Sequence, residues 1–95
     1  MAAYLIVDIQ VTDPAVFDEY KRRVPATIAA HGGRYLTRGG STEILEGSWR
    51  PRRTVILEFP SMANLKEWWD SPEYQGLCDI RKRSADSNIV TVDGA

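Results

Sequence analysis

Metal ligands and disulfide partners are scarce in this sequence of 95 residues. It contains one cysteine, Cys78, and one histidine, His31. A single cysteine cannot form an internal disulfide, and one histidine cannot supply the clustered ligands of a zinc site. We therefore predict no metal site and no cofactor. Cys78 falls on an apolar helix face, where we expect an inert, buried thiol.

An excess of one charge and a long apolar run are also missing. Twelve lysines and arginines accompany thirteen aspartates and glutamates, which gives a formal net charge of -1. Nucleic-acid-binding domains usually carry a net basic footprint, and a bilayer-spanning helix needs about 20 apolar residues. The first residues lack the basic start of a signal peptide. We predict a cytoplasmic protein without nucleic-acid or membrane partners.

Strand periodicity is clearest in two segments. Along residues 4–11 apolar side chains occupy every second position, and the alternate positions are half apolar and half polar. Residues 54–59 alternate in the same way, with one acidic residue on the mixed face. Shorter strands are expected at residues 34–38 and 87–92, so the chain has four main strands.

Helices are predicted from their start signals. Asp13-Pro14, Ser61 and Ser71-Pro72 each place a capping side chain before a helical stripe, and proline is favoured at the first helical position. Pro25 lies inside the first stripe. It cannot donate a hydrogen bond to the carbonyl of Lys21, so we expect it to kink or split that helix.

The order of these elements is β-α-β-β-α-β, which predicts one ferredoxin-like α+β domain over residues 1–95. The helices should cover one face of an antiparallel-dominated sheet. An extra hairpin is expected after the second strand, with a turn at Gly39-Gly40 and a short returning strand at Glu43–Gly47.

The sheet face away from the helices is predicted to be covered by a second copy. It contains Tyr4, Ile6 and Ile56, which are too apolar to be left in water. We expect two chains to pack sheet to sheet as a C2 homodimer and so to form a dimeric α+β barrel.

Several motifs carry a resemblance to a known family. They are His31-Gly32-Gly33-Arg34-Tyr35-Leu36, Arg38-Gly39-Gly40, Glu46-Gly47-Ser48-Trp49-Arg50-Pro51, Glu58-Phe59-Pro60-Ser61 and Ser71-Pro72-Glu73-Tyr74-Gln75. The chain resembles, nearly end to end, the small bacterial proteins grouped as domain of unknown function 1330. The resemblance implies a dimeric α+β barrel. Relatives in that superfamily include cofactor-free monooxygenases, muconolactone isomerase and haem-degrading enzymes, and fold alone does not choose among them.

Two acids are the first catalytic candidates. Asp8 and Glu58 fall on the strand faces that point away from the helices, in the interior of the predicted barrel. A half-buried carboxylate there is a candidate base for proton transfer. The alternative is a structural ion pair with Arg34 or Arg38, or simple solvation near the barrel mouth.

His31 is the third catalytic candidate, because imidazole titrates near neutral pH. Its alternative role is that of a histidine favourably placed at the negative end of a helix dipole. Arg34 and Arg38, four residues apart on one strand, are expected on the same face, where they would clamp a carboxylate. Their alternative role is to neutralise nearby acids.

Two aromatic residues complete the candidate binding residues. Trp49 lies in a loop and is either a lid over a pocket or, as we favour, an anchor in the dimer interface. Tyr20 lies on the helix face that should meet the sheet. It is a candidate ligand contact, with simple packing as the alternative.

Two functional hypotheses follow. The first is a cofactor-independent enzyme that acts on a small organic or aromatic acid in a pocket between sheet and helices, with Glu58 or Asp8 as base and Arg34 or Arg38 holding the anion. The second is a non-catalytic dimeric module that binds a ligand or is associated with stress. A weaker third is an interaction domain without a pocket.

Overall fold

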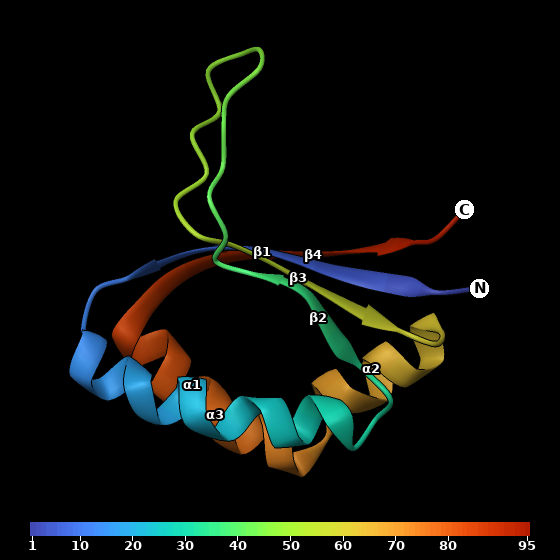
Figure 1. Ribbon diagram of the computed structural model, residues 1–95. Coiled ribbons are helices and arrows are strands. Elements are labelled where there is room, and N and C mark those ends of the chain that lie inside the picture. Colours follow the sequence, from blue (N-terminus) through green and yellow to red (C-terminus); the bar gives the residue numbers. More distant parts are fainter.

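Strands and helices follow one another along the chain in the predicted order, with two helices in place of the second one. The computed structural model describes residues 1–95. Its elements are β1 (Ala3–Val11), α1 (Pro14–Ala29), β2 (Arg34–Arg38), β3 (Thr54–Phe59), α2 (Met62–Asp70), α3 (Pro72–Ser84) and β4 (Ala85–Asp93). The strands form one antiparallel sheet in the order β2-β3-β1-β4 (Figure 1). This confirms the ferredoxin-like α+β prediction.

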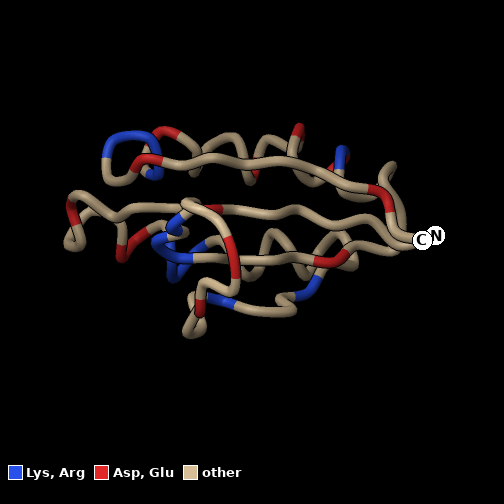
Figure 2. Tube along the Cα trace, turned by 90° about the horizontal axis from the view of Figure 1, so that it is seen from above, with Lys and Arg blue, Asp and Glu red and all other residues tan.

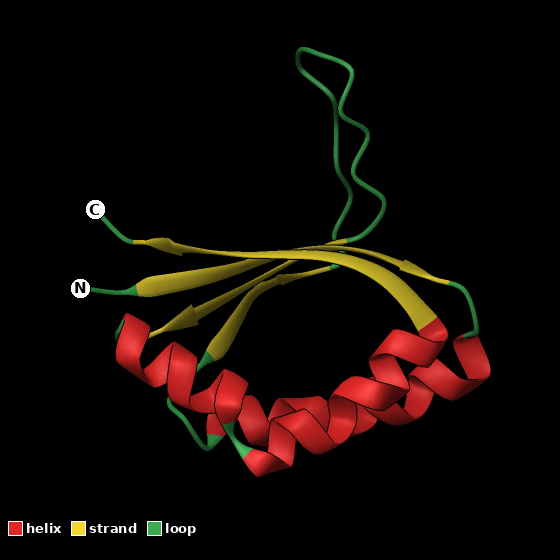
Figure 3. Cartoon of the chain, turned by 180° about the vertical axis from the view of Figure 1, so that it is seen from behind, coloured by secondary structure: helices red, strands yellow, loops and turns green.

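All three helices lie on one face of the curved sheet (Figures 1 and 3). Leu5, Val7 and Ile9 of β1 are buried on this inner face, whereas Ile6 and Asp8 are half-buried on the outer face. Successive side chains of a strand point to opposite faces, so the alternation in the sequence becomes two different surfaces. Charges are sparse along β1 and β3, the two central strands of the sheet (Figure 2). Asp8 is the single charged residue of β1.

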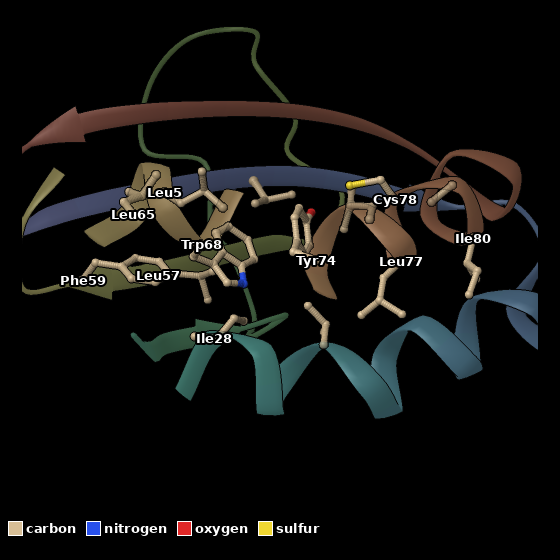
Figure 4. Close-up of a cluster of buried hydrophobic side chains, with 14 of the residues drawn as sticks. Leu5, Ile28, Leu57, Phe59, Leu65, Trp68, Tyr74, Leu77, Cys78 and Ile80 are labelled. Carbon is tan, nitrogen blue, oxygen red and sulfur yellow. The ribbon is translucent and has the colours of Figure 1, made fainter. Parts of the chain in front are cut away.

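The centre of the core is aromatic (Figure 4). The ring centroids of Trp68 and Tyr74 lie 4.1 Å apart, and that of Phe59 lies 5.4 Å from Trp68. The indole Nε1 of Trp68 donates a hydrogen bond to Thr27 Oγ1 at 3.0 Å, so its one polar atom is satisfied. Trp68 is fully buried in this core, and Cys78 is buried as expected.

The predicted helix starts are confirmed by their hydrogen bonds. The side chains of Asp13, Ser61 and Ser71 accept from the backbone N–H three residues later, at 3.3, 3.1 and 3.3 Å respectively. These bonds satisfy amides that have no partner inside the helix.

Pro25 does not split α1, which runs without interruption from Pro14 to Ala29. Of the two expected outcomes, a kink or a split, the split is therefore wrong. The carbonyl that proline leaves free also has another donor. Arg38 Nη2 donates to the carbonyl oxygen of Lys21 at 2.7 Å. The cost of the missing helical bond is therefore offset from β2.

The predicted returning strand at Glu43–Gly47 is absent. Residues 39–53, here called the arm, instead project from the sheet on the side away from the helices (Figures 1 and 3). Residues 41–50 are all exposed, so the segment has no sheet neighbour against which a strand could form. A strand at an isolated position gains too little burial to be stable.

A β-bulge in β2 changes the direction of its side chains. Tyr35 opposes Leu57 of β3, but Thr37 opposes Ile56, so one extra residue is inserted at Leu36. Each residue after the bulge is shifted to the other face. As a result Arg34 lies on the outer face and Arg38 on the inner face, and the prediction of a shared face was wrong.

No helix of the structure combines the length and the apolar character that a membrane crossing requires.

Candidate ligand pocket between the sheet and the helices

The two acids predicted as catalytic are separated from each other. Asp8 opposes Thr54 in the β1–β3 ladder, whereas Glu58 opposes Tyr4. These positions are four residues apart, which is about 13 Å along a strand. Asp8 Oδ1 accepts from the backbone N–H of Arg52 at 2.9 Å.

Glu58 has its own partner on the outer face. Its Oε1 accepts from Arg34 Nε and lies equally close, at 2.7 Å, to Arg34 Nη2. Glu58 therefore forms the ion pair with Arg34 that was the alternative to a catalytic role. Both acids are outside the pocket described next.

A cavity of about 60 Å³ lies between the sheet and the helices. Thirteen of its 17 lining residues are hydrophobic, and most come from β1, α1 and β3. The charged members are Lys21, Arg38, Arg53 and Arg81, and no aspartate or glutamate lines the cavity. This cavity is therefore apolar in its walls and carries charge of one sign only.

Two tyrosine hydroxyls meet inside this cavity. Tyr20 from α1 and Tyr74 from α3 have their hydroxyl oxygens 3.1 Å apart. Burial raises the pKa of Tyr20 well above its ordinary value, and proximity to Tyr74 adds to this. Burial likewise raises the pKa of Tyr74. The pair is therefore neutral near pH 7, and since only one of its two protons is used between the rings, the other is available to a ligand.

Arg81 is the most unusual residue of the cavity. It is 7% exposed, and its Nε is buried without a hydrogen-bond partner. None of the ion pairs in the structure involves it. Its guanidinium lies 5.9 Å from the centre of the Trp69 ring, which is a weak contact. Burial alone would lower the pKa of Arg81, but Tyr74, Cys78 and Tyr20 raise it, so neutral groups surround the guanidinium and no carboxylate does. A buried charge without a counter-ion is costly, so this position favours an anion.

Two more guanidinium groups border the same cavity. Arg38 lies 4.6 Å from the centre of the Tyr35 ring and is bonded to the Lys21 carbonyl. Arg53, at the end of the arm, has a buried Nε without a partner. Both add positive potential at the cavity without supplying a compensating acid.

The remaining predicted residues lie elsewhere. His31 follows α1, and its Nδ1 lies 3.1 Å from the carbonyl oxygen of Thr27, to which it donates. Trp49 is on the arm and is 67% exposed. Of the seven predicted site residues, only Tyr20 and Arg38 line the cavity.

The most informative cavity residue was missed by sequence reasoning, although a signal was present. Tyr74, Leu77, Cys78 and Arg81 share one face of α3 at i, i+3, i+4 and i+7. An arginine that continues an apolar stripe lies on the helix face that meets the core, so the pattern indicates Arg81 as a candidate for burial.

A four-stranded antiparallel sheet with helices on one face and a pocket between the two layers defines the chain as a ferredoxin-like α+β protein. The chain belongs to the family described as domain of unknown function (DUF1330), whose model matches residues 2–95. A search of curated proteins found no match.

Solved structures share this fold at low sequence identity. The RPA0582 protein of unknown function from Rhodopseudomonas palustris is 18% identical, with a TM-score of 0.78 over 99% of this chain and 82% of that one. A dimeric ferredoxin-like protein of unknown function from Jannaschia sp. CCS1 is 15% identical, with a TM-score of 0.71 over 99% and 100%. SnoaB, a cofactor-independent oxygenase from Streptomyces nogalater, is 11% identical, with a TM-score of 0.68 over 99% and 93%. Identities this low show a common fold and no common activity.

Proposed function

We propose that this protein is a homodimeric, cofactor-independent enzyme that acts on a small organic or aromatic acid bound between its sheet and its helices. The observation that carries the proposal is Arg81, which is 7% exposed and has no acidic partner in an apolar cavity. A carboxylate supplies the missing counter-ion, because a guanidinium binds it through two parallel hydrogen bonds.

The apolar walls of the cavity favour a compact ring or chain behind that carboxylate. Phe17 and Trp68 are among the lining residues, and such walls contribute binding through burial while a few polar groups fix orientation. The cavity measures only about 60 Å³, so an aromatic acid enters it by moving the lining side chains apart.

Catalysis without a cofactor requires groups that stabilise charge as it develops on the substrate. The neutral Tyr20–Tyr74 pair donates a hydrogen bond to the oxygen of a phenolate that enters the cavity already ionised, and the surrounding guanidinium groups stabilise its charge, so this step needs no base in the cavity. Asp8 and Glu58 lie across the sheet from this cavity, so we assign proton donation to the tyrosines. The fold shared with SnoaB, a cofactor-independent oxygenase, is consistent with this class of chemistry.

The proposed homodimer places a second sheet over the outer face. Ile56, Ile6 and Val90 stand opposite one another on three adjacent strands of that face, and an apolar row of this kind is typical of an interface. The relative from Jannaschia sp. CCS1 is described as dimeric. Two facing sheets would form the barrel that we expect.

Binding is tested with two ligands of nearly equal shape, benzoate and benzamide. Because a ligand that binds only the folded state raises the unfolding temperature, we expect benzoate to stabilise the protein and benzamide to do so far less. Arg81→Gln should weaken benzoate binding by about 10- to 100-fold, since a charge-assisted hydrogen bond is lost. Arg83→Gln is the matched control, because Arg83 lies on the same helix but is exposed and paired with Asp79.

Equal binding of the two ligands, or equal losses in the two variants, would contradict the carboxylate site. Turnover is tested separately, by mass spectrometry of a panel of small aromatic acids incubated in air. Tyr20→Phe should abolish product formation and leave benzoate binding within a few-fold. Binding without turnover of any acid would favour the second hypothesis, a non-catalytic ligand-binding module.

A further inference from the structure

The arm, residues 39–53, presents large apolar side chains that its own chain leaves exposed. Leu45 is 89% exposed and Trp49 67%, and Ile44 is also exposed. Large apolar side chains gathered at the end of a projection are expected only where a partner covers them.

The arm leaves the sheet from a fixed base. Gly39 N–H donates to the carbonyl of Thr54 at 2.9 Å, and Ile9 N–H donates to the carbonyl of Arg53 at 3.0 Å. Arg52 is held through its backbone N–H by Asp8. These bonds tie both ends of the arm to the sheet, so its direction is set by the fold.

The arm and the unpartnered sheet face point to the same side of the molecule. Figures 1 and 3 show the arm on the side opposite the helices, which is also the side of the Ile6, Ile56 and Val90 row. A second copy that covers this row must therefore lie beside the arm. This step rests on the homodimer proposed above.

The length of the arm exceeds the space between two packed sheets. Residues 40–46 span at most about 25 Å when extended, whereas sheets packed face to face are about 10 Å apart. The arm starts from β2, an edge strand. An arm of this length reaches beyond a second sheet packed on the outer face.

We infer that the arm is a clasp, in which Ile44 and Leu45 of each copy pack against the flank of the other. Two arms related by the two-fold axis would hold the sheets together from opposite edges. The partner is a second copy of this chain.

The first test compares two substitutions that add the same charge to the arm. Leu45→Asp places a carboxylate at the apolar tip, and Ser41→Asp places it at an exposed polar position near the base. By analytical ultracentrifugation we expect Leu45→Asp to raise the dimer dissociation constant at least about tenfold. Ser41→Asp should leave it within about twofold.

The second test maps the contact directly. Leu45 is replaced by the photo-cross-linking amino acid p-benzoylphenylalanine, and irradiation should give a covalent dimer whose cross-linked peptide belongs to the partner. The same replacement of Lys82, an exposed residue of α3, is the control and should give far less covalent dimer.

The outcomes separate the clasp from the homodimer. A dimer that tolerates Leu45→Asp, and cross-links only within one chain, overturns the clasp and leaves the homodimer in place. Equal weakening by both aspartates also overturns the clasp, because charge alone would then explain it. A wild-type protein that is monomeric at all concentrations overturns both proposals.

Discussion

Arg34 and Arg81 lie on opposite sides of the sheet and differ in burial and in whether they have an acidic partner. Arg34 is on the outer side, exposed, and bonded to Glu58. Arg81 is on the helical side, almost fully buried, and has no acidic partner. The outer charge is matched by the fold itself, while the inner charge is left to be matched by something else. Unmatched charge, more than charge as such, identifies the candidate site.

The two faces of the sheet should differ most in how they respond to an added charge. Leu57 and Ile56, adjacent residues of β3 on opposite faces, allow the same substitution to be compared. Leu57→Asp places a carboxylate in the buried core and should lower the free energy of unfolding by more than about 4 kcal/mol. Ile56→Asp places the same group on the outer face and should give monomers or aggregates while the core remains packed.

Near-ultraviolet circular dichroism, which reports on the packing of Trp68, distinguishes the two results. Its signal should be lost in Leu57→Asp and retained in Ile56→Asp. An unchanged dimer in Ile56→Asp would contradict the assignment of the outer face as an interface.

Removing the unmatched charge should have little effect on the stability of the ligand-free protein. Arg81→Leu replaces a buried guanidinium that has no acidic partner by an apolar group, so the free energy of unfolding should change by less than about 2 kcal/mol. Most truncations of a buried residue lower it. Urea unfolding measures the change, and a loss above about 2 kcal/mol would show that Arg81 has a structural partner.

The tyrosine pair makes the cavity side sensitive to alkali. Burial raises the pKa of Tyr20 and Tyr74 above 10.0, the value expected in the unfolded chain. Unfolding above pH 10 therefore releases protons, so this contribution to stability is complete below pH 10 and declines as the pH rises further. Each phenol contributes a slope of up to about 1.4 kcal/mol per pH unit.

Tyr20→Phe should remove part of this slope. Urea unfolding of the wild type and of the variant at pH 8 and pH 11 gives the comparison. Equal losses of stability between the two pH values would mean that Tyr20 ionises as readily in the folded chain as in the unfolded one.

The sequence is sufficient to predict the fold because its signals are local. Periodicity gave the strands, and the caps at Asp13, Ser61 and Ser71 gave the helix starts. The absent strand at residues 43–47 was misread because turn signals alone cannot show whether a neighbouring strand is available. Strand existence there depends on tertiary contacts.

The candidate site was harder to predict, for two physical reasons. A single bulge at Leu36 turns Arg38 into the cavity and leaves Arg34 outside it, and no local signal marks that bulge. The separation of Asp8 from Glu58 depends on register, which a single sequence does not fix. Arg81, by contrast, was readable from its place on the apolar stripe of α3.

The smallest expected change in stability comes from Glu58→Gln. This variant also best distinguishes a catalytic site on the inner face from one on the outer face. Glu58→Gln removes the ion pair with Arg34, whose side chain is 70% exposed, so the free energy of unfolding should fall by less than about 1 kcal/mol. The fall should shrink further in high salt, which screens such pairs. Benzoate binding should remain within about twofold, because the carboxylate lies across the sheet from the cavity. If Glu58 is instead the base that its position on the strand first suggested, turnover would be abolished in this variant while the dimer survives. Measuring turnover, benzoate affinity and dimer mass on the same preparation therefore decides whether the chemistry belongs to the inner or the outer face.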